Sequence, residues 1–328
     1  MITFHPLPGR PAGWDDAIRE YPGKTLFHES AWLDHVQSIH PRGQLRYFEI
    51  RDGDERVGLH CALRITKMGI AIHGSPLGGT GTNFMGPLVR AGIDPRKTVR
   101  GLTRLFGPRH FLHLEVSHPS LDRAMMVEEG FQVQENVTHL CPLPATEEAA
   151  WATLRSEARN RVRKAERAGV VVERTDDPAV VDHFFDQFGE VYGKQGMAVP
   201  FGPERPRSLY EHLHRAGRLL PIWAKKDGEV LAAGLFPFDE RCIYFWGAAS
   251  WIRHHALCPN EALHWGVIRF AVERGIPLYN MCGGQSQFKN KFGGEDVPYL
   301  TFYRSALPFL ETARNLYRAR HFRALRAA

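Results

Sequence analysis

The chain has 328 residues, 43% of them hydrophobic and 24% charged, which is enough apolar surface for a large core or two domains and excludes a disordered chain. It contains no apolar run of the roughly 20 residues that a membrane-spanning helix needs, and its first residues, MITFHPLPGRPAGWDD, lack the pattern of a secretory signal. The net charge of +6 favours anionic partners such as RNA or phosphorylated substrates, and we expect a cytoplasmic enzyme.

The first half of the chain alternates helix and strand patterns. SAWLDHVQSI is typical of a helix, and LRYFEIRDGDERVGLHCALRIT predicts a hairpin that turns at Asp52-Gly53. The glycine-rich stretch SPLGGTGTNFMGPLV comes next, and its glycines are expected to serve tight turns, with phosphate binding as the alternative. PRKTVRGLTRLFG predicts a helix, and HFLHLEVSH and FQVQENVTHLCPL predict strands.

The second half, after a break at LPATEE, repeats this order. Residues Glu148 to Ala168 predict one helix, opened by a Thr146 cap and closed by Gly169. VVVERT predicts a strand, and two further helices and a three-strand meander follow it. The remaining segments are predicted as a helix (NEALHWGVIRFAVERG), a strand (IPLYNMC), a loop (GGQSQFKNKFGGE), a strand (VPYLTFYRS) and a basic terminal helix.

This element order predicts an α/β (α+β) fold made of two tandem domains of the GNAT acyltransferase type. Each domain is expected to hold a mixed, mostly antiparallel sheet flanked by helices. The break near residue 145 divides the chain into a domain of residues 1–145 and a domain of residues 146–328.

Arginines recur every four residues in the helix predicted from Glu148. Such a row of like charges on one helix face implies nearby acids or an anionic ligand, and a solvated basic face is the alternative. We expect three of these arginines and one in the basic terminal helix to contact tRNA or another anion: Arg159, Arg163, Arg167 and Arg318.

The segment SWIRHHALCPNEALHWG occupies the place where GNAT enzymes carry a glycine-rich turn for the pyrophosphate of coenzyme A. Ala256 and Cys258 stand where glycines are needed, and Pro259 lacks a backbone N–H. The sequence therefore disfavours a coenzyme A site. The five cysteines are scattered and no His-Glu-x-x-His motif occurs, so we expect no metal, no disulfide framework and no bound cofactor.

Three motifs, RNRVRKAERAGV (from Arg159), NEALHWGVIRFAVERGIPLYNMCG and FKNKFGG, resemble the FemAB family of aminoacyltransferases, which extend peptidoglycan precursors from aminoacyl-tRNA, and their GNAT-like relatives. The resemblance covers residues 146–305 well, whereas the first half of the chain resembles the family only in the order of its helices and strands. It implies a pair of GNAT-like domains and no metal or free coenzyme. The family's Phe-Lys pair falls on Phe288 and Lys289, and its basic acceptor-binding residue falls loosely on Lys194. The sequence departs from the family at Asn280, where the family has Asp, and in lacking a long coiled-coil arm.

Lys289 has a chemical role that does not depend on the family. Attack of an amine on an ester carbonyl places negative charge on oxygen, and an ammonium within hydrogen-bonding reach stabilises it. A solvated loop lysine is the alternative for Lys289, and this alternative is stronger for Lys291. With Lys194 and Lys291, the further expected substrate-binding residues are Phe288, Phe292, Trp246, Asn260 and Tyr210. The general base is not identified, and its candidates by location are Asp296, Glu295 and Glu261.

Three functional hypotheses remain open. The first is aminoacyl transfer from aminoacyl-tRNA to an amine of a peptidoglycan precursor or peptide-like acceptor. The second is N-acyl transfer from acyl-CoA or an acyl carrier protein in polysaccharide or lipid modification. The third is a non-catalytic module that binds an anionic glycan or RNA.

Overall fold

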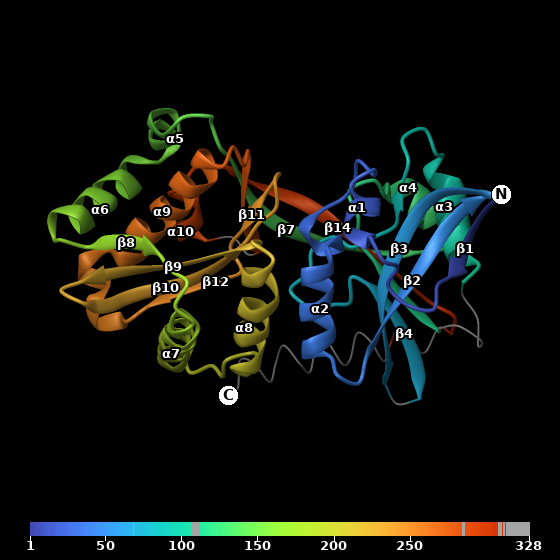
Figure 1. Cartoon of the computed structure of the whole chain (residues 1–328), viewed down its shortest axis with the longest axis horizontal. Coiled ribbons are helices and arrows are strands. Elements are labelled where there is room, and N and C mark those ends of the chain that lie inside the picture. The colour runs from blue at the N-terminus through green and yellow to red at the C-terminus, as the bar shows by residue number, and fades with distance from the viewer. Residues whose placement is uncertain (68, 106–111, 284–285, 308–309, 311, 313–328) are drawn as a thin grey trace. The chain divides into compact units, whose positions relative to one another are not determined.

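The protein is described here by a computed structural model, which places residues 1–67, 69–105, 112–283, 286–307, 310 and 312 (Figure 1). Among the described residues the chain divides into two compact units: unit 1 is Met1–Asn136 with the described residues that follow Pro298, and unit 2 is Val137–Pro298. Two strands, β7 (Gln132–Pro142) and β14 (Glu295–Ser305), carry the chain from one unit to the other. The division into domains of residues 1–145 and 146–328 remains a prediction. The predicted basic terminal helix, which includes Arg318, lies outside the described residues.

Unit 1 contains a sheet in the order β1-β2-β3-β4-β6-β14, with β5 paired to β3. Its other strands are β1 (Ile2–Pro6), β2 (Gln44–Asp52), β3 (Glu55–Lys67), β4 (Ile70–Ser75), β5 (Leu88–Val89) and β6 (His113–Val116). Its helices are α1 (Trp14–Ile18), the 3₁₀ turn η1 (Leu26–His28), α2 (Ser30–Ile39), α3 (Pro95–Thr103) and α4 (Arg123–Glu128).

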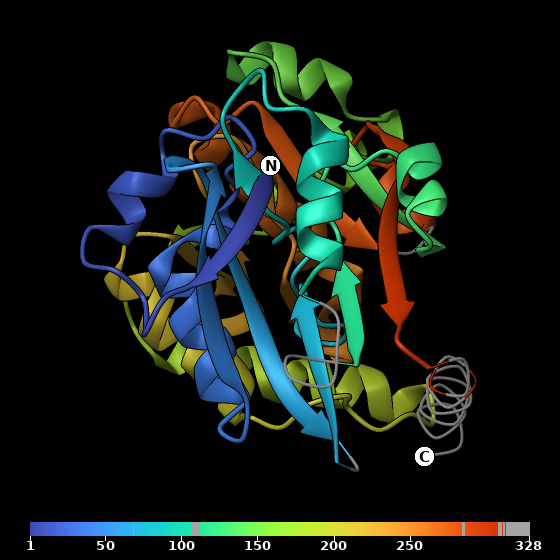
Figure 2. The ribbon, with the colours of Figure 1, turned by 90° about the vertical axis from the view of Figure 1, so that its right-hand side faces the viewer.

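The β2–β3 hairpin is confirmed, and it buries side chains on both faces. Asp52 pairs with Glu55, and Gly53 turns with φ of +62°. Because successive strand residues face opposite sides, Tyr47 packs with α1 and α2 while Phe48 packs with α3 on the other face. Unit 1 is therefore a sheet with helices on both faces (Figure 2).

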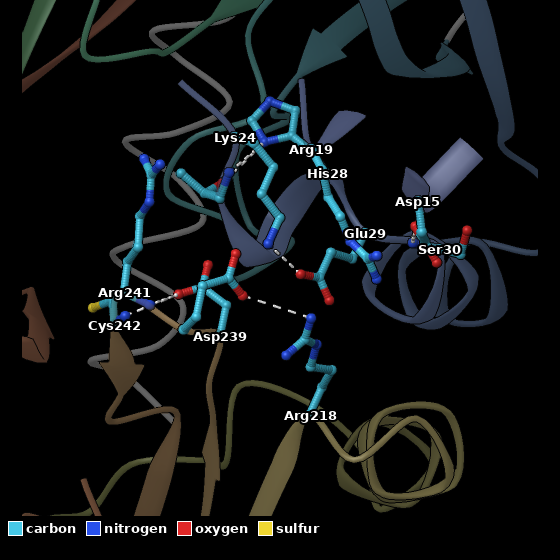
Figure 3. Close-up of polar contacts among 12 residues, drawn as sticks. Asp15, Arg19, Lys24, His28, Glu29, Ser30, Arg218, Asp239, Arg241 and Cys242 are labelled. Carbon is cyan, nitrogen blue, oxygen red and sulfur yellow. Dashed lines mark hydrogen bonds and ion pairs between the residues drawn. The ribbon is translucent and has the colours of Figure 1, made fainter. Parts of the chain in front are cut away.

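Unit 1 also encloses a buried ion pair. Lys24 Nζ lies 2.5 Å from Glu29 Oε1, with side chains 5% and 7% exposed (Figure 3). A buried pair of this kind recovers its desolvation cost only through close geometry, so both partners are needed together.

Four buried histidines of unit 1 are neutral in the fold. His28 accepts from the Thr25 N–H at Nδ1 and donates from Nε2 to Gly86 O, and burial lowers its pKa to about 3. His60 and His73 share a hydrogen bond between their Nε2 atoms of 3.1 Å, and burial lowers the pKa of both. Burial also lowers the pKa of His118.

Unit 2 contains strands of two sheets. The first has the order β7-β13-β11, and the second has the order β12-β10-β9-β8. The strands are β8 (Val171–Arg174), β9 (Leu219–Lys226), β10 (Glu229–Pro237), β11 (Ile243–Tyr244), β12 (Gly247–Ser250) and β13 (Leu278–Gly283). The helices are α5 (Glu147–Thr153), α6 (Ser156–Arg167), α7 (Ala179–Lys194), α8 (Glu204–Leu209), α9 (Pro259–Glu273) and α10 (Gln287–Asn290), with a π-helical turn η2 (Tyr210–His214) and a 3₁₀ turn η3 (Ile252–Leu257).

Helices cover both faces of the second sheet of unit 2. α9 packs on one face, with α6 against it, and α7 packs on the other (Figure 1). The β9–β10 hairpin turns at Asp227 and Gly228, both with positive φ, as Asp-Gly turns require.

The prediction of one helix from Glu148 to Ala168 is wrong. Leu154 and Arg155 adopt extended backbone with ψ of 142° and 153°, which ends α5 and makes Arg155 the cap of α6. The break lets Leu154 turn into the core, where its side chain is 2% exposed. Thr146 does cap α5, since its Oγ1 accepts from the Ala149 N–H, and Gly169 follows α6 with φ of +79°.

Among the placed residues, no helix is both long and apolar enough to cross a bilayer.

The buried neutral histidines predict that the protein loses stability in mild acid. Between pH 3 and 6.5 an unfolded histidine binds a proton that folded His28 or His73 does not, so the unfolded state is favoured as pH falls below about 6.5. Each such histidine should cost about 2 kcal/mol at pH 5, from roughly 1.4 kcal/mol per pH unit. Urea denaturation at pH 7.5 and pH 5, followed by tryptophan fluorescence, measures this loss. His5→Gln, at an exposed position, should leave the difference unchanged, whereas equal stability at the two pH values would contradict the account.

Candidate functional site

The two sheets of unit 2 separate at one point in the chain. β11 pairs in parallel with β13, whereas β12, three residues further on, pairs antiparallel with β10. Phe245 and Trp246 lie between them, and Phe245 N still donates to Asn280 O at 2.8 Å. The third strand of the predicted meander is therefore divided, because its backbone leaves one ladder to join the other.

Phe245 begins an aromatic cluster that reaches the Phe-Lys motif. Its ring lies 4.7 Å from that of His264 on α9, and the His264 ring lies 5.1 Å from Phe288 on α10. Phe292, 1% exposed, packs 5.3 Å from Phe288. Burial lowers the pKa of His264 to about 3, so this ring is neutral, and its Nδ1 lies 2.7 Å from the Tyr279 hydroxyl.

Trp246 belongs to a second, partly exposed aromatic cluster. Its ring lies 5.5 Å from Phe201 and 5.9 Å from Phe184. Phe201 stacks on Phe188 of α7 at 5.6 Å, and the Arg205 guanidinium lies 5.3 Å above Phe201. Adjacent residues at the strand division thus face two aromatic clusters, which can line a site for a partly apolar substrate.

Lys289 lies on α10, in what was predicted to be a loop. Ser286 Oγ caps this short helix by accepting from the Phe288 N–H at 3.2 Å. Lys289 Nζ donates to Cys282 O at 3.1 Å and to Gly283 O, at the end of β13. Its half-buried position lowers the pKa of the ammonium. The structure therefore brings a partly desolvated cation to the carboxyl end of a central strand.

Lys291, in contrast, is held by acids. Its Nζ lies 3.1 Å from Glu261 Oε1 and 3.2 Å from Glu157 Oε1. Arg161 also approaches Glu261 at 3.6 Å. Because Glu261 is 5% exposed, these cations compensate a buried carboxylate, and the network ties α10 to α6 and α9.

The glycine pair after Phe292 is pressed against β7. Gly293 and Gly294 have φ of +82° and +79°, and a Cβ on Gly294 would lie 2.2 Å from Leu140 O. His139 of β7 holds the same turn, with Nε2 2.8 Å from Gly293 O and Nδ1 2.8 Å from Asp296 Oδ1. The glycines are needed both for their backbone conformation and for close approach.

The three candidate base residues differ in their surroundings. Asp296 pairs with His139, Glu261 pairs with Lys291, and Glu295 is exposed. Asn280, which replaces the family's Asp, is buried and accepts at Oδ1 from Thr138 Oγ1 and from the Cys282 N–H. The side-chain amide of Asn280 therefore links the end of β13 to Thr138 of β7.

The arginines of α6 that were expected to contact tRNA or another anion also make contacts within unit 2. Arg159 donates to the Leu154 carbonyl at 2.5 Å and so caps α5, and Arg167 donates to Arg163 O. Arg163 lies 5.4 Å above the Trp151 ring and remains exposed. The exposed side of α6 is nevertheless basic.

The other expected substrate-binding residues are dispersed. Asn260 donates from Nδ2 to Ser250 Oγ at 2.8 Å, at the end of β12. Tyr210 donates to Asp176 O at 2.6 Å, and Lys194 is exposed at the end of α7. No contact in the described residues brings Tyr210 or Lys194 to Lys289.

The segment that would bind a coenzyme A pyrophosphate forms η3. Arg253 donates to Glu229 Oε1 at 2.8 Å, and His254 lies 3.0 Å from the same carboxylate. In unit 1, the amide of Gly78 in the glycine-rich loop donates to Glu115 Oε2 at 3.1 Å. Both places already hold a carboxylate, which opposes phosphate binding. The predicted tight turns occur at Gly79 and Gly81.

A cavity of about 490 Å³ lies elsewhere in unit 2, between β8 and α9. Its charged lining is already paired, Arg269 with Glu147 and Arg174 with Glu273, so it offers no uncompensated group for chemistry. Among the described residues, no group of three or more His, Cys, Asp or Glu side chains is arranged to hold a metal ion.

Sequence reasoning missed several residues that the fold brings to Lys289 and Trp246. His264 is at an apolar helix position, and His139 is an isolated histidine within a strand. Phe188 and Phe201 are separated from Trp246 by more than forty residues of chain. Their only sequence signal is the high aromatic content of the segment from Phe184 to Phe201.

The comparisons agree with this geometry. Residues 152–290, which include α6 through α10, match the family model described as an acetyltransferase (GNAT) domain. These residues form a GNAT-type acyltransferase domain. No curated protein matches the chain significantly.

Solved structures extend the likeness to nearly the whole chain. FemX has a TM-score of 0.74 at 14% identity, covering 91% of this chain and 97% of its own. A protein of unknown function from Bacteroides thetaiotaomicron has a TM-score of 0.60 at 12% identity, covering 92% and 99%. A tandem GNAT protein from the clavulanic acid biosynthesis pathway has a TM-score of 0.50 at 13% identity, covering 94% and 99%. The predicted α/β fold of tandem GNAT-like domains and the resemblance to FemAB-like and GNAT acyltransferases are confirmed. The match over residues 152–290 identifies that part of the chain as an acyltransferase domain.

Gly294→Ala should destabilise the protein by roughly 2–5 kcal/mol, because the added Cβ meets Leu140 O and the left-handed backbone is costly. Gly196→Ala is the matched control, since Gly196 has φ of +64° with no atom within 4 Å of its Cβ position. Urea denaturation of both variants measures the difference, and equal losses would show that Gly294 is not confined by β7.

Lys291→Met should lower stability by about 2–3 kcal/mol, because it leaves the buried Glu261 with Arg161 as its remaining cation. Lys97→Met, on the exposed face of α3, should have little effect. Thermal denaturation distinguishes them, and an unchanged midpoint for Lys291→Met would mean that the network does not support α10.

Proposed function

We propose that the protein transfers an aminoacyl group from aminoacyl-tRNA to an amine of a peptidoglycan precursor or another peptide-like acceptor, forming an amide bond. The observation that carries this proposal is the position of Lys289, a partly desolvated ammonium next to the strand division in a domain with the fold of FemX. We place the reaction in the cytoplasm, where charged tRNA is available.

The chemistry asks little of the protein beyond positioning and charge. The acceptor nitrogen attacks the ester carbonyl, the bond from the carbonyl carbon to the terminal ribose oxygen breaks, and the ribose hydroxyl leaves with the proton that the amine gives up. Negative charge develops on the carbonyl oxygen, and an ammonium in a site of low polarity stabilises it strongly. Lys289 is proposed for this role, with Phe288 and Trp246 as apolar walls for the acyl group and acceptor.

The surroundings of the site favour tRNA as the donor. Arg253 and His254, where a pyrophosphate would be bound in a coenzyme A enzyme, are engaged by Glu229. The exposed arginines of α6, with Arg163 and Arg167 among them, supply positive charge suited to a phosphate backbone. Arg159 would contribute through α5, which it caps.

The second candidate is an N-acyltransferase that uses acyl-CoA or an acyl carrier protein in polysaccharide or lipid modification. The match to the acetyltransferase (GNAT) model favours it. A carrier protein with an acidic surface would also meet the basic side of α6.

The deciding experiment mixes the protein with bulk tRNA charged with radiolabelled amino acids and with UDP-linked muramyl pentapeptide, and follows label in the peptide. We expect product that RNase treatment of the donor abolishes, and a 10²–10³-fold lower rate for Lys289→Met. Lys97→Met, on the exposed face of α3, should retain the wild-type rate. Product formed equally from acetyl-CoA without tRNA would overturn the tRNA proposal in favour of the second candidate.

A further inference from the structure

His139 differs from the other buried histidines in what its two ring nitrogens face. Its side chain is 2% exposed, Nδ1 lies 2.8 Å from a carboxylate oxygen of Asp296, and Nε2 lies 2.8 Å from the carbonyl oxygen of Gly293. A carbonyl and an ionised carboxylate can only accept hydrogen bonds. Two good hydrogen bonds therefore require a proton on each nitrogen.

His28 and His118 show the opposite arrangement in the same protein. The Thr25 N–H donates to Nδ1 of His28, and the Ser120 N–H donates to Nδ1 of His118. Each ring then donates from Nε2 to a backbone carbonyl. One acceptor and one donor nitrogen define a neutral ring, so these two histidines provide internal references.

We propose that His139 is a buried imidazolium that clamps the turn from Gly293 to Asp296 and thereby positions the α10 segment carrying Lys289. It is a positioning residue, because the hydrogen bonds that its ring makes in the described part of the chain are with the turn.

The groups around His139 support this state. Asp296 supplies the compensating negative charge that a buried cation needs. Cys141, on the same face of β7, donates from Sγ to Gly293 O at 3.2 Å, and burial raises its pKa to about 12, so it stays a neutral thiol. Burial lowers the pKa of Lys289, and the negative charge of Asp296 acts against that shift. Asp296 thus links the imidazolium to the proposed catalytic ammonium.

The clamp also explains why the turn lies so close to β7. Gly293 O receives two donors from this strand, and Gly294 leaves no space for a side chain beside Leu140 O. The turn follows Phe292 directly, so fixing it fixes the end of the segment whose beginning is capped by Ser286.

The alternative is a neutral His139 beside a protonated Asp296, with one shared proton placed on the carboxylate. Ring-nitrogen NMR of protein labelled with ¹⁵N-histidine at pH 7.5 separates the two states, and His139→Gln assigns the signal by its loss. We expect both nitrogens of His139 to show protonated shifts, while His28 and His118 each show one protonated and one unprotonated nitrogen. One unprotonated nitrogen in His139 would overturn the proposal.

Asp296→Asn provides the matched variant. Without the carboxylate, His139 should lose one ring proton, whereas the His28 signals stay unchanged. Two protonated nitrogens in Asp296→Asn would show that the carboxylate is not what holds the charge, and would overturn the clamp.

Hydrogen exchange tests the positioning. In His139→Gln, the amides of Lys289 and Phe292, which donate to Ser286 O and Lys289 O, should exchange about 10- to 100-fold faster, as expected for loss of one charge-assisted hydrogen bond. The amide of Val162 in α6 should be unaffected. Unchanged exchange at Lys289 and Phe292 would contradict the positioning role.

The clamp depends on the proposed function in one respect only: that Lys289, which the clamped segment carries, acts in acyl transfer. The ring-nitrogen and exchange measurements involve no donor or acceptor, so they decide the clamp even if no transfer from tRNA occurs. Conversely, a neutral His139 would overturn the clamp but would not affect the test of transfer from aminoacyl-tRNA.

Discussion

The candidate site depends on a geometric constraint: one strand cannot stay paired with two sheets that diverge. The backbone from Ile243 to Ser250 leaves β13 and joins β10 within a few residues, and Phe245 and Trp246 occupy the change. Their side chains are thereby directed into two different aromatic clusters. A substrate group placed at this division would meet apolar walls from both clusters and main-chain groups from the strand ends.

The second requirement is a cation at this division, and the protein meets it by fixing a short helix at several points. α10 is capped by Ser286, packed on His264 through Phe288, and tied to α6 and α9 by the Lys291 network. The turn after it is pressed against β7. Lys289 can therefore be partly desolvated without losing its place, which increases the electrostatic effect of its charge on a nearby oxyanion.

Much of the fold could be predicted from the sequence, because its signals are local. The Asp-Gly turns and the Thr146 cap each follow from neighbouring residues. The break at Leu154 could not be predicted in this way, since helix propensity and spacing both continue through it, and tertiary burial of Leu154 decides the outcome. The division of the third meander strand is likewise set by pairing with β13, which lies more than thirty residues away in sequence.

The candidate site was predictable only where residues are adjacent in sequence. Phe288 and Lys289 form a motif, and so were recognised together, whereas His139 and His264 come from other elements. The different environments of Lys289 and Lys291 also depend on partners from distant segments, the carbonyls of β13 for one and two glutamates for the other.

The central claim is that the acyl donor is bound where the sheets of unit 2 separate, beside Lys289. Hydrogen exchange with a non-hydrolysable amide-linked aminoacyl-adenosine, compared with acetyl-CoA, tests it most directly. The account predicts slower exchange at Trp246 and through α10 with the adenosine analogue, and no such change with acetyl-CoA. Protection confined to other segments, or protection of η3 by acetyl-CoA alone, would contradict it.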